Sequence, residues 1–255
     1  MATQTQKIAL ITGGSRGLGR NTAESLAARG VDSVITYHSR AEEAQAVVAA
    51  IQAQGRKAVA LQLDAGATKT FAGFVDRLKK ALQNTWGRSS FDFLVNNAGI
   101  SHHAAFDKVT EEELDSLYQV HFKGVFFLTQ KLLPLMEDGG RVVMLSSGTT
   151  RIIYPGSGAY ASMKGAIETL ALYLAKELGS RRIAVNTVAP GAIATDFSGG
   201  MVRDNPEVNK VVAGMTALGR AGVPDDIGPM IASLLSEDNR WVNAQRIEVS
   251  GGMSI

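Results

Sequence analysis

The chain has 255 residues, of which 45% are hydrophobic and 20% are charged, a balance typical of a globular protein with a large buried core. Its 26 basic residues are interspersed with 24 acidic ones, and the small net charge of +2 argues against nucleic acid or an anionic membrane surface as a partner. The absence of cysteine excludes disulfides and thiol chemistry.

No targeting or linking segment stands out along the chain. The first residues, Met1–Gln6, lack the basic start and the apolar core of a secretory signal, and no apolar run reaches a membrane-spanning length. No internal repeat, low-complexity run or linker divides the sequence. We therefore expect a cytoplasmic protein with one domain over residues 1–255 and no membrane partner.

Short apolar segments alternate with longer, helix-like segments. We predict strands near residues 7–12, 33–37, 57–63, 91–96, 141–146, 182–188 and 246–249. Connections of a dozen or more residues imply right-handed strand-helix-strand units. The expected fold class is α/β, a doubly wound parallel sheet of about seven strands with helices on both faces. In such sheets ligands bind beyond the carboxyl ends of the strands.

A glycine-rich turn follows the first predicted strand. The strand Lys7–Thr12 runs into Gly13–Gly19, and a helix-like stretch continues to Arg29. Glycines at this place let backbone amides and the positive end of a helix approach a pyrophosphate. The spacing Thr-Gly-x-x-x-Gly-x-Gly differs from the Gly-x-Gly-x-x-Gly of many dinucleotide folds, and a glycine-rich loop alone is equally typical of a tight turn.

Three residues form a candidate proton-transfer group. On a helix, positions i and i+4 share one face, so we expect the Lys164 ammonium near the Tyr160 phenol. A free phenol has a pKa of ~10, and a close cation would lower it toward a usable range. Ser147 stands 13 residues before Tyr160 at a strand end and would hold a carbonyl oxygen. Taken alone, the Tyr-x-x-x-Lys spacing is weak evidence, because the tyrosines and lysines of this chain would give it by chance at roughly 0.2 per chain. The alternatives are a strand-end serine that caps local backbone and a tyrosine on a helix surface or at an interface.

The motifs together resemble the short-chain dehydrogenase/reductase family in order and spacing. They are the glycine turn, Asn96-Asn97-Ala98-Gly99 after an apolar strand, Ser147 with Tyr160 and Lys164, and Pro190-Gly191 after another strand. Gly219–Ile227 and Ile247–Gly252 are similar to the family's C-terminal signatures. The likeness covers almost the whole chain. It implies a Rossmann fold and a carbonyl reductase of the kind of 3-oxoacyl-carrier-protein reductases or sugar and polyol dehydrogenases.

The sequence favours NADP(H) over NAD(H). An enzyme built for NAD would carry an acid after the second strand to bind the ribose hydroxyls, whereas this chain has Thr36-Tyr37-His38-Ser39-Arg40. Arg16 and Arg40 are the expected clamp for the 2′-phosphate, the alternative being ordinary solvated arginines. Cofactor-binding candidates besides these two are Gly13, Ser15, Gly17, Leu18, Gly19, His38, Ser39, Asp64, Ala65, Asn97, Ala98, Gly99, Tyr160, Lys164, Pro190, Gly191, Ile193 and Thr195.

The resemblance also implies a reaction. Hydride passes from NADPH to a ketone or aldehyde carbon, while Tyr160 gives a proton to the oxygen that Ser147 holds and Lys164 binds the nicotinamide ribose. The segment Pro190–Thr195 would fix the carboxamide, so that one ring face meets the substrate. The alternative is a cofactor-binding protein that has lost efficient catalysis and acts as a sensor or structural partner.

His121 stands where the family usually has an asparagine, in Val120-His121-Phe122-Lys123-Gly124. In the family that position perturbs a helix, and its main-chain carbonyl holds a water that relays protons to the lysine. A backbone carbonyl survives a change of side chain, and an imidazole can itself carry a proton near neutral pH. His121 is therefore a catalytic candidate, with a packed polar side chain as the alternative.

The expected substrate pocket is mostly apolar. Residues 192–216 form a long insertion with a flexible Ser198-Gly199-Gly200 and are expected to act as a substrate lid. His102 and His103 are adjacent, which suits a pocket wall and not a metal site, so we expect no metal. Arg151 either pairs with an acidic substrate group or is solvated. The other expected wall residues are Phe106, Thr149, Ile152, Ile153, Tyr154, Phe197, Met201 and Met215.

The helix predicted from Tyr160 to Gly179 is apolar over much of its circumference. A helix that lies on a sheet buries one stripe, so the remaining apolar residues imply a second packed face. We expect a partner subunit there, as in the tetramers common in the resembled family, unless loops of the same chain cover it.

Overall fold

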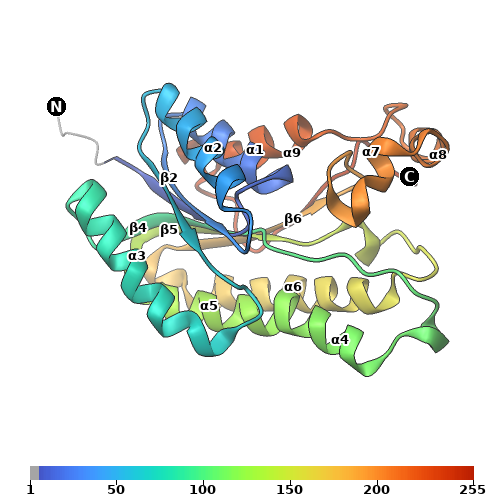
Figure 1. Ribbon diagram of the computed structural model, residues 1–255, viewed down its shortest axis with the longest axis horizontal. Helices are drawn as coiled ribbons and strands as arrows, with labels where there is room; N and C mark the ends of the chain where they lie inside the picture. Colours follow the sequence, from blue (N-terminus) through green and yellow to red (C-terminus); the bar gives the residue numbers. More distant parts are fainter. Residues whose placement is uncertain (1–5) are drawn as a thin grey trace.

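A seven-stranded sheet forms the centre of the protein (Figure 1). The computed structural model describes residues 6–255, and its strands lie in the order β3-β2-β1-β4-β5-β6-β7, each parallel to its neighbours. The strands are β1 (Ile8–Ile11), β2 (Asp32–Tyr37), β3 (Ala58–Gln62), β4 (Phe91–Asn96), β5 (Met136–Leu145), β6 (Ala184–Pro190) and β7 (Arg246–Val249). The predicted doubly wound α/β fold is confirmed.

Two strands extend by two or more residues beyond their predicted limits. β5 begins at Met136, which pairs with Phe91, and the register of this pairing shifts before Phe93. The prediction was based on apolar runs and missed this part of the strand, because residues 137–140 are acidic residues and glycines. β6 continues to Pro190, which pairs with Val249 of β7.

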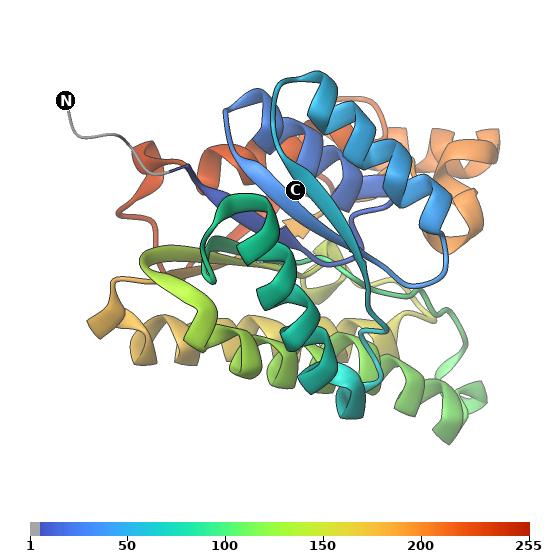
Figure 2. The same cartoon turned by 60° about the vertical axis from the view of Figure 1, so that its left-hand side comes forward.

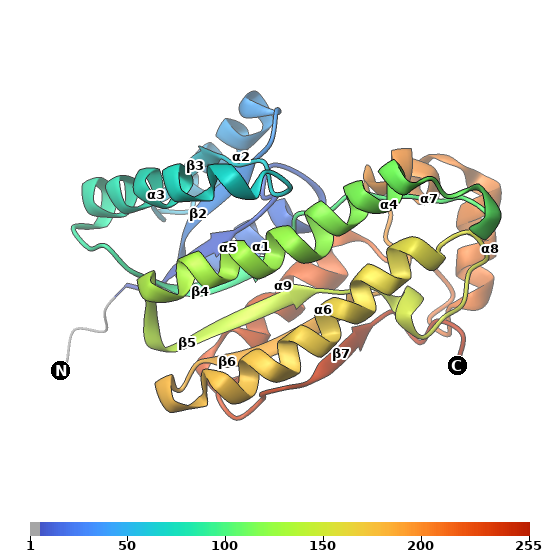
Figure 3. The same cartoon turned by 90° about the horizontal axis from the view of Figure 1, so that it is seen from below.

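Helices cover both faces of the sheet (Figure 2). One layer holds α1 (Gly17–Ala28), α2 (Ala41–Ala53) and α9 (Pro224–Leu234), and the other holds α3 (Phe71–Trp86), α4 (Glu111–Tyr118), α5 (Gly124–Leu132) and α6 (Gly158–Glu177). Each layer has its own buried apolar cluster against the sheet. In Figure 3, α4 and α5 lie in line and run beside α6.

The helix α3 shows how the pattern of residues produces this packing. Phe71, Phe74, Leu78 and Leu82 recur every three or four residues and are fully buried against the sheet. Gly87 ends the helix with φ 68°, a left-handed conformation that glycine adopts without steric cost.

The carboxyl ends of the strands lie at one end of the molecule. Two short helices, α7 (Met201–Asp204) and α8 (Pro206–Met215), lie beyond these ends, with the C-terminus beside α8 (Figures 1 and 3). Among residues 6–255, no helix combines the length and the apolar character needed to cross a membrane.

The ends of β1 and β4 are joined through two side chains. The Thr12 hydroxyl accepts bonds from the backbone N–H groups of Asn97 at 2.9 Å and Ala98 at 3.0 Å. The Asn97 amide donates to the carbonyls of Thr12 at 2.8 Å and Gly13 at 3.0 Å. Helix α1 approaches this junction so closely that a Cβ on Gly19 would collide with the Gly13 carbonyl and lie 2.5 Å from Asn97 Nδ2.

We expect Gly19→Ala to lower the free energy of unfolding by about 1–3 kcal/mol, because the added methyl group overlaps a backbone that the Asn97 bonds hold in place. Urea unfolding measures the change. Gly214→Ala in α8 is the matched control, since no atom lies within 4 Å of the place that its Cβ would occupy, and it should be neutral or stabilising. Equal behaviour of the two variants would contradict the close approach of α1.

Candidate active site

Ser147, Tyr160 and Lys164 come together at the carboxyl end of β5. Ser147 follows the strand, and Tyr160 and Lys164 lie one turn apart near the start of α6. The Ser147 side chain acts on the Tyr160 phenol and lowers its pKa against the larger effect of burial, and Lys164 Nζ lies 5.6 Å from the centre of the Tyr160 ring. Ser147 Oγ accepts a bond from the Thr149 N–H at 3.2 Å, so its own hydrogen remains available as a donor.

Lys164 is a buried cation with 5% of its surface exposed. Its ammonium donates to the Leu145 carbonyl at 2.7 Å, and within residues 6–255 it forms no ion pair with a carboxylate. Burial lowers the pKa of Lys164 to about 7. A ligand that brings hydroxyls or negative charge to this ammonium would therefore help to keep it protonated.

The prediction that Lys164 lowers the pKa of Tyr160 is wrong for this structure. Burial raises the pKa of Tyr160 to about 12, and the hydrogen bond with Ser147 offsets only part of this effect. The ammonium lies over the ring and binds the Leu145 carbonyl instead of reaching the phenol oxygen. The phenol is consequently protonated at neutral pH, as a proton donor must be.

His121 lies in a π-helical turn, Gln119–Lys123, that joins α4 to α5. Such turns insert an extra residue into a helix and are frequent at functional sites. The helix is thus distorted at this position, as the resemblance implies, although the side chain is an imidazole. The ring meets Tyr160 edge-on, with centroids 5.3 Å apart.

The imidazole of His121 is neutral, and the expectation that it carries a proton near neutral pH is wrong. Its side chain is 1% exposed, and burial followed by the charge of Lys164 lowers the pKa of His121 to about 3. Nε2 lies 2.7 Å from the Ile100 carbonyl and 3.2 Å from the Ile100 N–H, and the shorter contact with the carbonyl favours the tautomer that carries the hydrogen on Nε2. Nδ1 is left as a buried acceptor without a partner in the described part of the chain.

The glycine turn offers free backbone amides. Gly13 and Gly17 have φ of 64° and 54°, conformations that other residues rarely adopt. In the described chain the first turn of α1 has neither a capping side chain nor an acidic residue, so its amides and positive end can receive an anion. Ser15 is buried within the turn, and Leu18 packs against the core.

The segment Asn97–Gly99 faces the same crevice through its backbone. Both hydrogen bonds of the Asn97 amide nitrogen go to the turn, so this side chain shapes the cradle. Gly99 packs on His121, because a Cβ there would lie 2.7 Å from His121 Cε1.

The residues expected around the adenosine lie beyond the ends of β2 and β3. His38 Nε2 is 3.7 Å from an Asp64 carboxylate oxygen, next to the partly buried Ala65, and Ser39 is exposed. Arg16 lies 3.7 Å from Asp196, and Arg40 pairs with Glu43 at 2.5 Å. Both arginines are about half exposed, so these surface pairs are weak and can be exchanged for a phosphate.

The segment after β6 connects the glycine turn with Tyr160. Pro190 ends the strand, and the Gly191 N–H donates to the Val249 carbonyl at 3.0 Å. Ile193 pairs with Gly222, and Thr195 is buried next to Gly17. The Phe197 ring lies 6.0 Å from the Tyr160 ring.

The expected pocket residues divide into exposed and buried groups. Phe106 and Ile153 are 96% and 81% exposed, and an open, mostly apolar hollow of ≈ 460 Å³ is lined by His103, Ala105, Phe106, Pro155 and Gly156.

His102 lies 3.7 Å from Glu113, and residues 6–255 contain no group of three metal-ligating side chains. The Thr149 hydroxyl is buried without a partner in the same range, whereas Ile152, Tyr154 and Met215 belong to a small apolar cluster.

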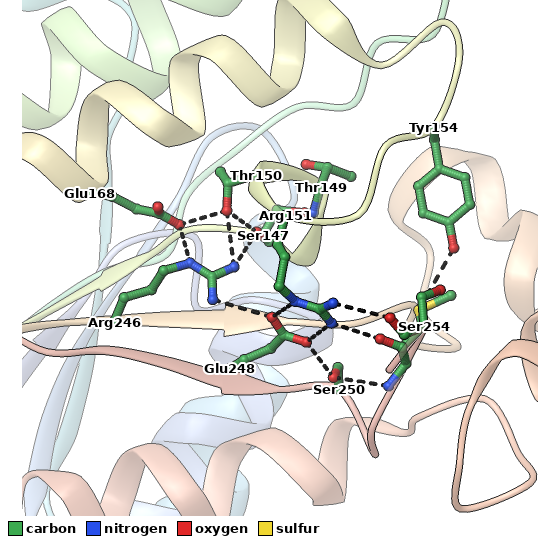
Figure 4. Close-up of polar contacts among 11 residues, drawn as sticks. Ser147, Thr149, Thr150, Arg151, Tyr154, Glu168, Arg246, Glu248, Ser250 and Ser254 are labelled. Atoms are coloured by element: carbon green, nitrogen blue, oxygen red, sulfur yellow. Dashed lines mark hydrogen bonds and ion pairs between the residues drawn. The ribbon is translucent and has the colours of Figure 1, made fainter.

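The Arg151 side chain is 41% exposed, as the solvated alternative predicts, but its guanidinium pairs within the protein and not with a free substrate group. It pairs with Glu248 and donates to the carbonyls of Met253 and Ser254 (Figure 4). Sequence reasoning also missed Glu168 and Arg246, which pair at 2.7 Å beside Ser147. Glu168 follows Lys164 by four residues on α6, and that spacing was the available signal.

Comparisons with known proteins agree with this arrangement. Residues 13–254 match a family model described as enoyl-(acyl carrier protein) reductase. An uncharacterized oxidoreductase of Methylorubrum extorquens is 38% identical over 97% of both chains. Trihydroxynaphthalene reductase of Pestalotiopsis fici is 32% identical over 96% of this chain and 88% of its own.

A solved structure of an angucycline C-6 ketoreductase with bound NADP has the same fold. It superimposes with a TM-score of 0.92 at 36% identity and covers 97% of this chain and 95% of its own. Sequence and structure thus match over almost the whole length. The chain therefore belongs to the short-chain dehydrogenase/reductase family.

Proposed function

We propose that this protein reduces a ketone group on a hydrophobic, aromatic compound, with NADPH as the hydride donor and Tyr160 as the acid. The observation that carries the proposal is the protonated Tyr160 phenol, which lies with Lys164 near the start of α6 and is influenced by Ser147 at the carboxyl end of β5. A carbonyl oxygen placed between these two hydroxyls would receive two hydrogen bonds.

The residues present fit NADP(H). The uncapped first turn of α1 and the glycines with positive φ suit the pyrophosphate, and the Lys164 ammonium suits the ribose hydroxyls. Arg16 and Arg40, with His38 and Ser39 nearby, suit a 2′-phosphate. When bound, NADPH supplies the hydride that the carbonyl carbon accepts.

The chain's own residues supply position and a proton. Ser147 donates to the carbonyl oxygen, and Tyr160 transfers its proton to that oxygen as the carbon gains the hydride, which gives the alcohol. Against the larger effect of burial, the interaction with Ser147 lowers the pKa of Tyr160 and so favours the phenolate that proton transfer leaves behind. The same groups run the reverse oxidation.

The alternative is a protein that binds the cofactor without efficient catalysis. The feature that favoured this alternative is His121, which stands where the family usually has asparagine. The π-helical turn at His121 weakens the argument, because the helix is distorted there even though the side chain is an imidazole. A protein that only binds NADPH has no need for Ser147, Tyr160 and Lys164 to converge.

The apolar hollow supports a hydrophobic, ring-shaped substrate. Two similar proteins are named as reductases of trihydroxynaphthalene and of an angucycline. Exposed apolar side chains at the same end of the molecule, Phe106, Ile153, Phe197 and Leu218, are suited to flat aromatic rings. Residues 192–216 would close over such a substrate as a lid.

The outer face of α4, α5 and α6 supports a homotetramer. Each of these helices carries exposed apolar residues, namely Tyr118, Phe126, Phe127, Leu172 and Tyr173. A second copy would cover this face about a two-fold axis. The cytoplasmic location expected from the sequence stays a prediction.

The first test follows loss of NADPH absorbance with a panel of polycyclic aromatic ketones, β-ketoesters and enoyl esters. Turnover is expected with ketones, and Tyr160→Phe should lower kcat about 10²- to 10⁴-fold, because it removes the proton donor. Tyr173→Phe, an exposed tyrosine of the same helix, is the control. Tight NADPH binding with no turnover of any compound would favour the non-catalytic alternative.

We expect Arg16→Ala and Arg40→Ala each to lower kcat/KM for NADPH about 10- to 100-fold, the loss of one charge-assisted contact with phosphate. The value for NADH should change little. Arg20→Ala, which breaks a pair with Glu24 on the same helix, is the control. Equal losses with both cofactors would refute the 2′-phosphate clamp.

We expect kcat/KM for NADPH to fall as pH rises through about 7. The pKa of Lys164 in the folded protein is lowered to about 7, so the ammonium is present below this pH and lost above it. Initial rates at saturating ketone between about pH 6.5 and 9.5 give the profile. A profile flat up to pH 9 would contradict the account of Lys164.

His121→Asn should keep or raise turnover and leave the descending limb of this profile in place, because the neutral imidazole carries no proton to lose in this range. A collapse of the rate in this variant would show that the imidazole is essential.

A further inference from the structure

A network of charged side chains links the loop that carries Ser147 to the C-terminal end of the chain (Figure 4). We call residues 146–151 the serine loop and residues 250–254 the C-terminal strap. Arg151 Nε and Nη2 donate to the two carboxylate oxygens of Glu248 at 2.8 and 2.5 Å. The same guanidinium donates to the carbonyls of Met253 at 2.7 Å and Ser254 at 3.2 Å. One side chain of the serine loop thus holds both β7 and the strap.

The network continues from Glu248 to the catalytic helix. Arg246 donates to Glu248 at 3.2 Å and to Glu168 of α6 at 2.7 Å. Glu168 also accepts a bond from the Ser146 hydroxyl at 2.6 Å, and Arg246 lies 3.4 Å from the Ser147 carbonyl. The backbone around Ser147 is therefore fixed to α6 on one side and to β7 on the other.

The strap makes a different set of contacts on its other side. Thr216 pairs with Met253, and the Ser254 N–H donates to the Met215 carbonyl at 2.8 Å, so the strap is joined to the end of α8. The Tyr154 hydroxyl lies 3.9 and 3.7 Å from the sulfurs of Met215 and Met253. Ile152, Val212 and Met253 are buried in one apolar cluster. The strap consequently lies between the serine loop and the lid segment.

Within residues 6–255, the pair of Arg151 and Glu248 is the only ion pair that joins the serine loop to β7, from which the C-terminal strap continues. Glu248 is 18% exposed, and its hydrogen bonds, led by that from Arg151, lower the pKa of Glu248 to about 2. Loss of Arg151 would leave two strap carbonyls without this donor. Because Arg151 donates two hydrogen bonds to the two carboxylate oxygens of Glu248, the pair fixes the relative orientation of the two side chains as well as their distance.

We propose that Arg151 and Glu248 form a clasp that holds the C-terminal strap, and with it the wall of Tyr154, Met215 and Met253, in register with Ser147. Both are positioning residues, because neither touches the reacting atoms. The clasp sets the binding of bulky ketones while leaving the hydride and proton transfers unchanged. This inference rests on the proposed function of the site.

The test uses Arg151→Met, Glu248→Gln and the double variant. Asp138→Asn is the matched control, because it breaks an ion pair of 2.8 Å with Arg181 at the amino end of β5. Hydrogen exchange followed by mass spectrometry should show faster exchange of both the strap and residues 149–152 in all three clasp variants. The control should exchange there as the wild type does.

Steady-state kinetics with a polycyclic ketone provides the second measurement. Each clasp variant should raise KM about tenfold, the value of one lost charge-assisted contact, with kcat and the Kd of NADPH within about threefold. The double variant should raise KM by less than the product of the two single effects, since the singles share the loss of the pair between Arg151 and Glu248. Additive losses, an unchanged KM, or an equal rise in Asp138→Asn would overturn the clasp.

If the wild type turns over no ketone, the proposed function fails, and the exchange data alone decide the clasp. Unchanged exchange of the strap and of residues 149–152 in Arg151→Met would then overturn it, and faster exchange in both would support it.

Discussion

The bonds between Thr12 and Asn97 are the constraint on which the site depends. They join the carboxyl ends of β1 and β4, the two strands at which the chain order of the sheet reverses and a crevice opens. Because Asn97 also binds the Gly13 carbonyl, the start of the glycine turn that leads into α1 is held in place. The cofactor cradle is therefore a product of strand order and two polar side chains.

The second half of the site depends on burying a cation beside a phenol. Burial lowers the pKa of Lys164 and raises the pKa of Tyr160. The pKa values of the two groups, which are similar in free side chains, are therefore far apart in the folded protein. A protonated donor is available at neutral pH, and the lysine is sensitive to whatever charge a ligand brings. The burial of Lys164 and Tyr160 lowers the stability of the fold, but it provides the proton donor that carbonyl reduction requires.

The sequence predicted the sheet and the position of each motif, because apolar runs and glycine turns are local signals. It did not predict the pKa of Tyr160 or the neutral state of His121, since both depend on burial that the whole fold produces. The sequence also did not reveal the ion pair of the exposed Arg151, for a similar reason. Its partners Glu248 and Met253 lie 97 and 102 residues away, and no local pattern marks such a contact.

The central claim is that the crevice holds NADPH with one face of the nicotinamide toward Tyr160 and the ketone. The most direct measurement uses the two forms of NADPH that carry deuterium on opposite faces of C4, with mass spectrometry of the alcohol formed. The account predicts complete transfer of deuterium to the carbinol carbon from one form and none from the other. Transfer from both forms, or from neither, would contradict it.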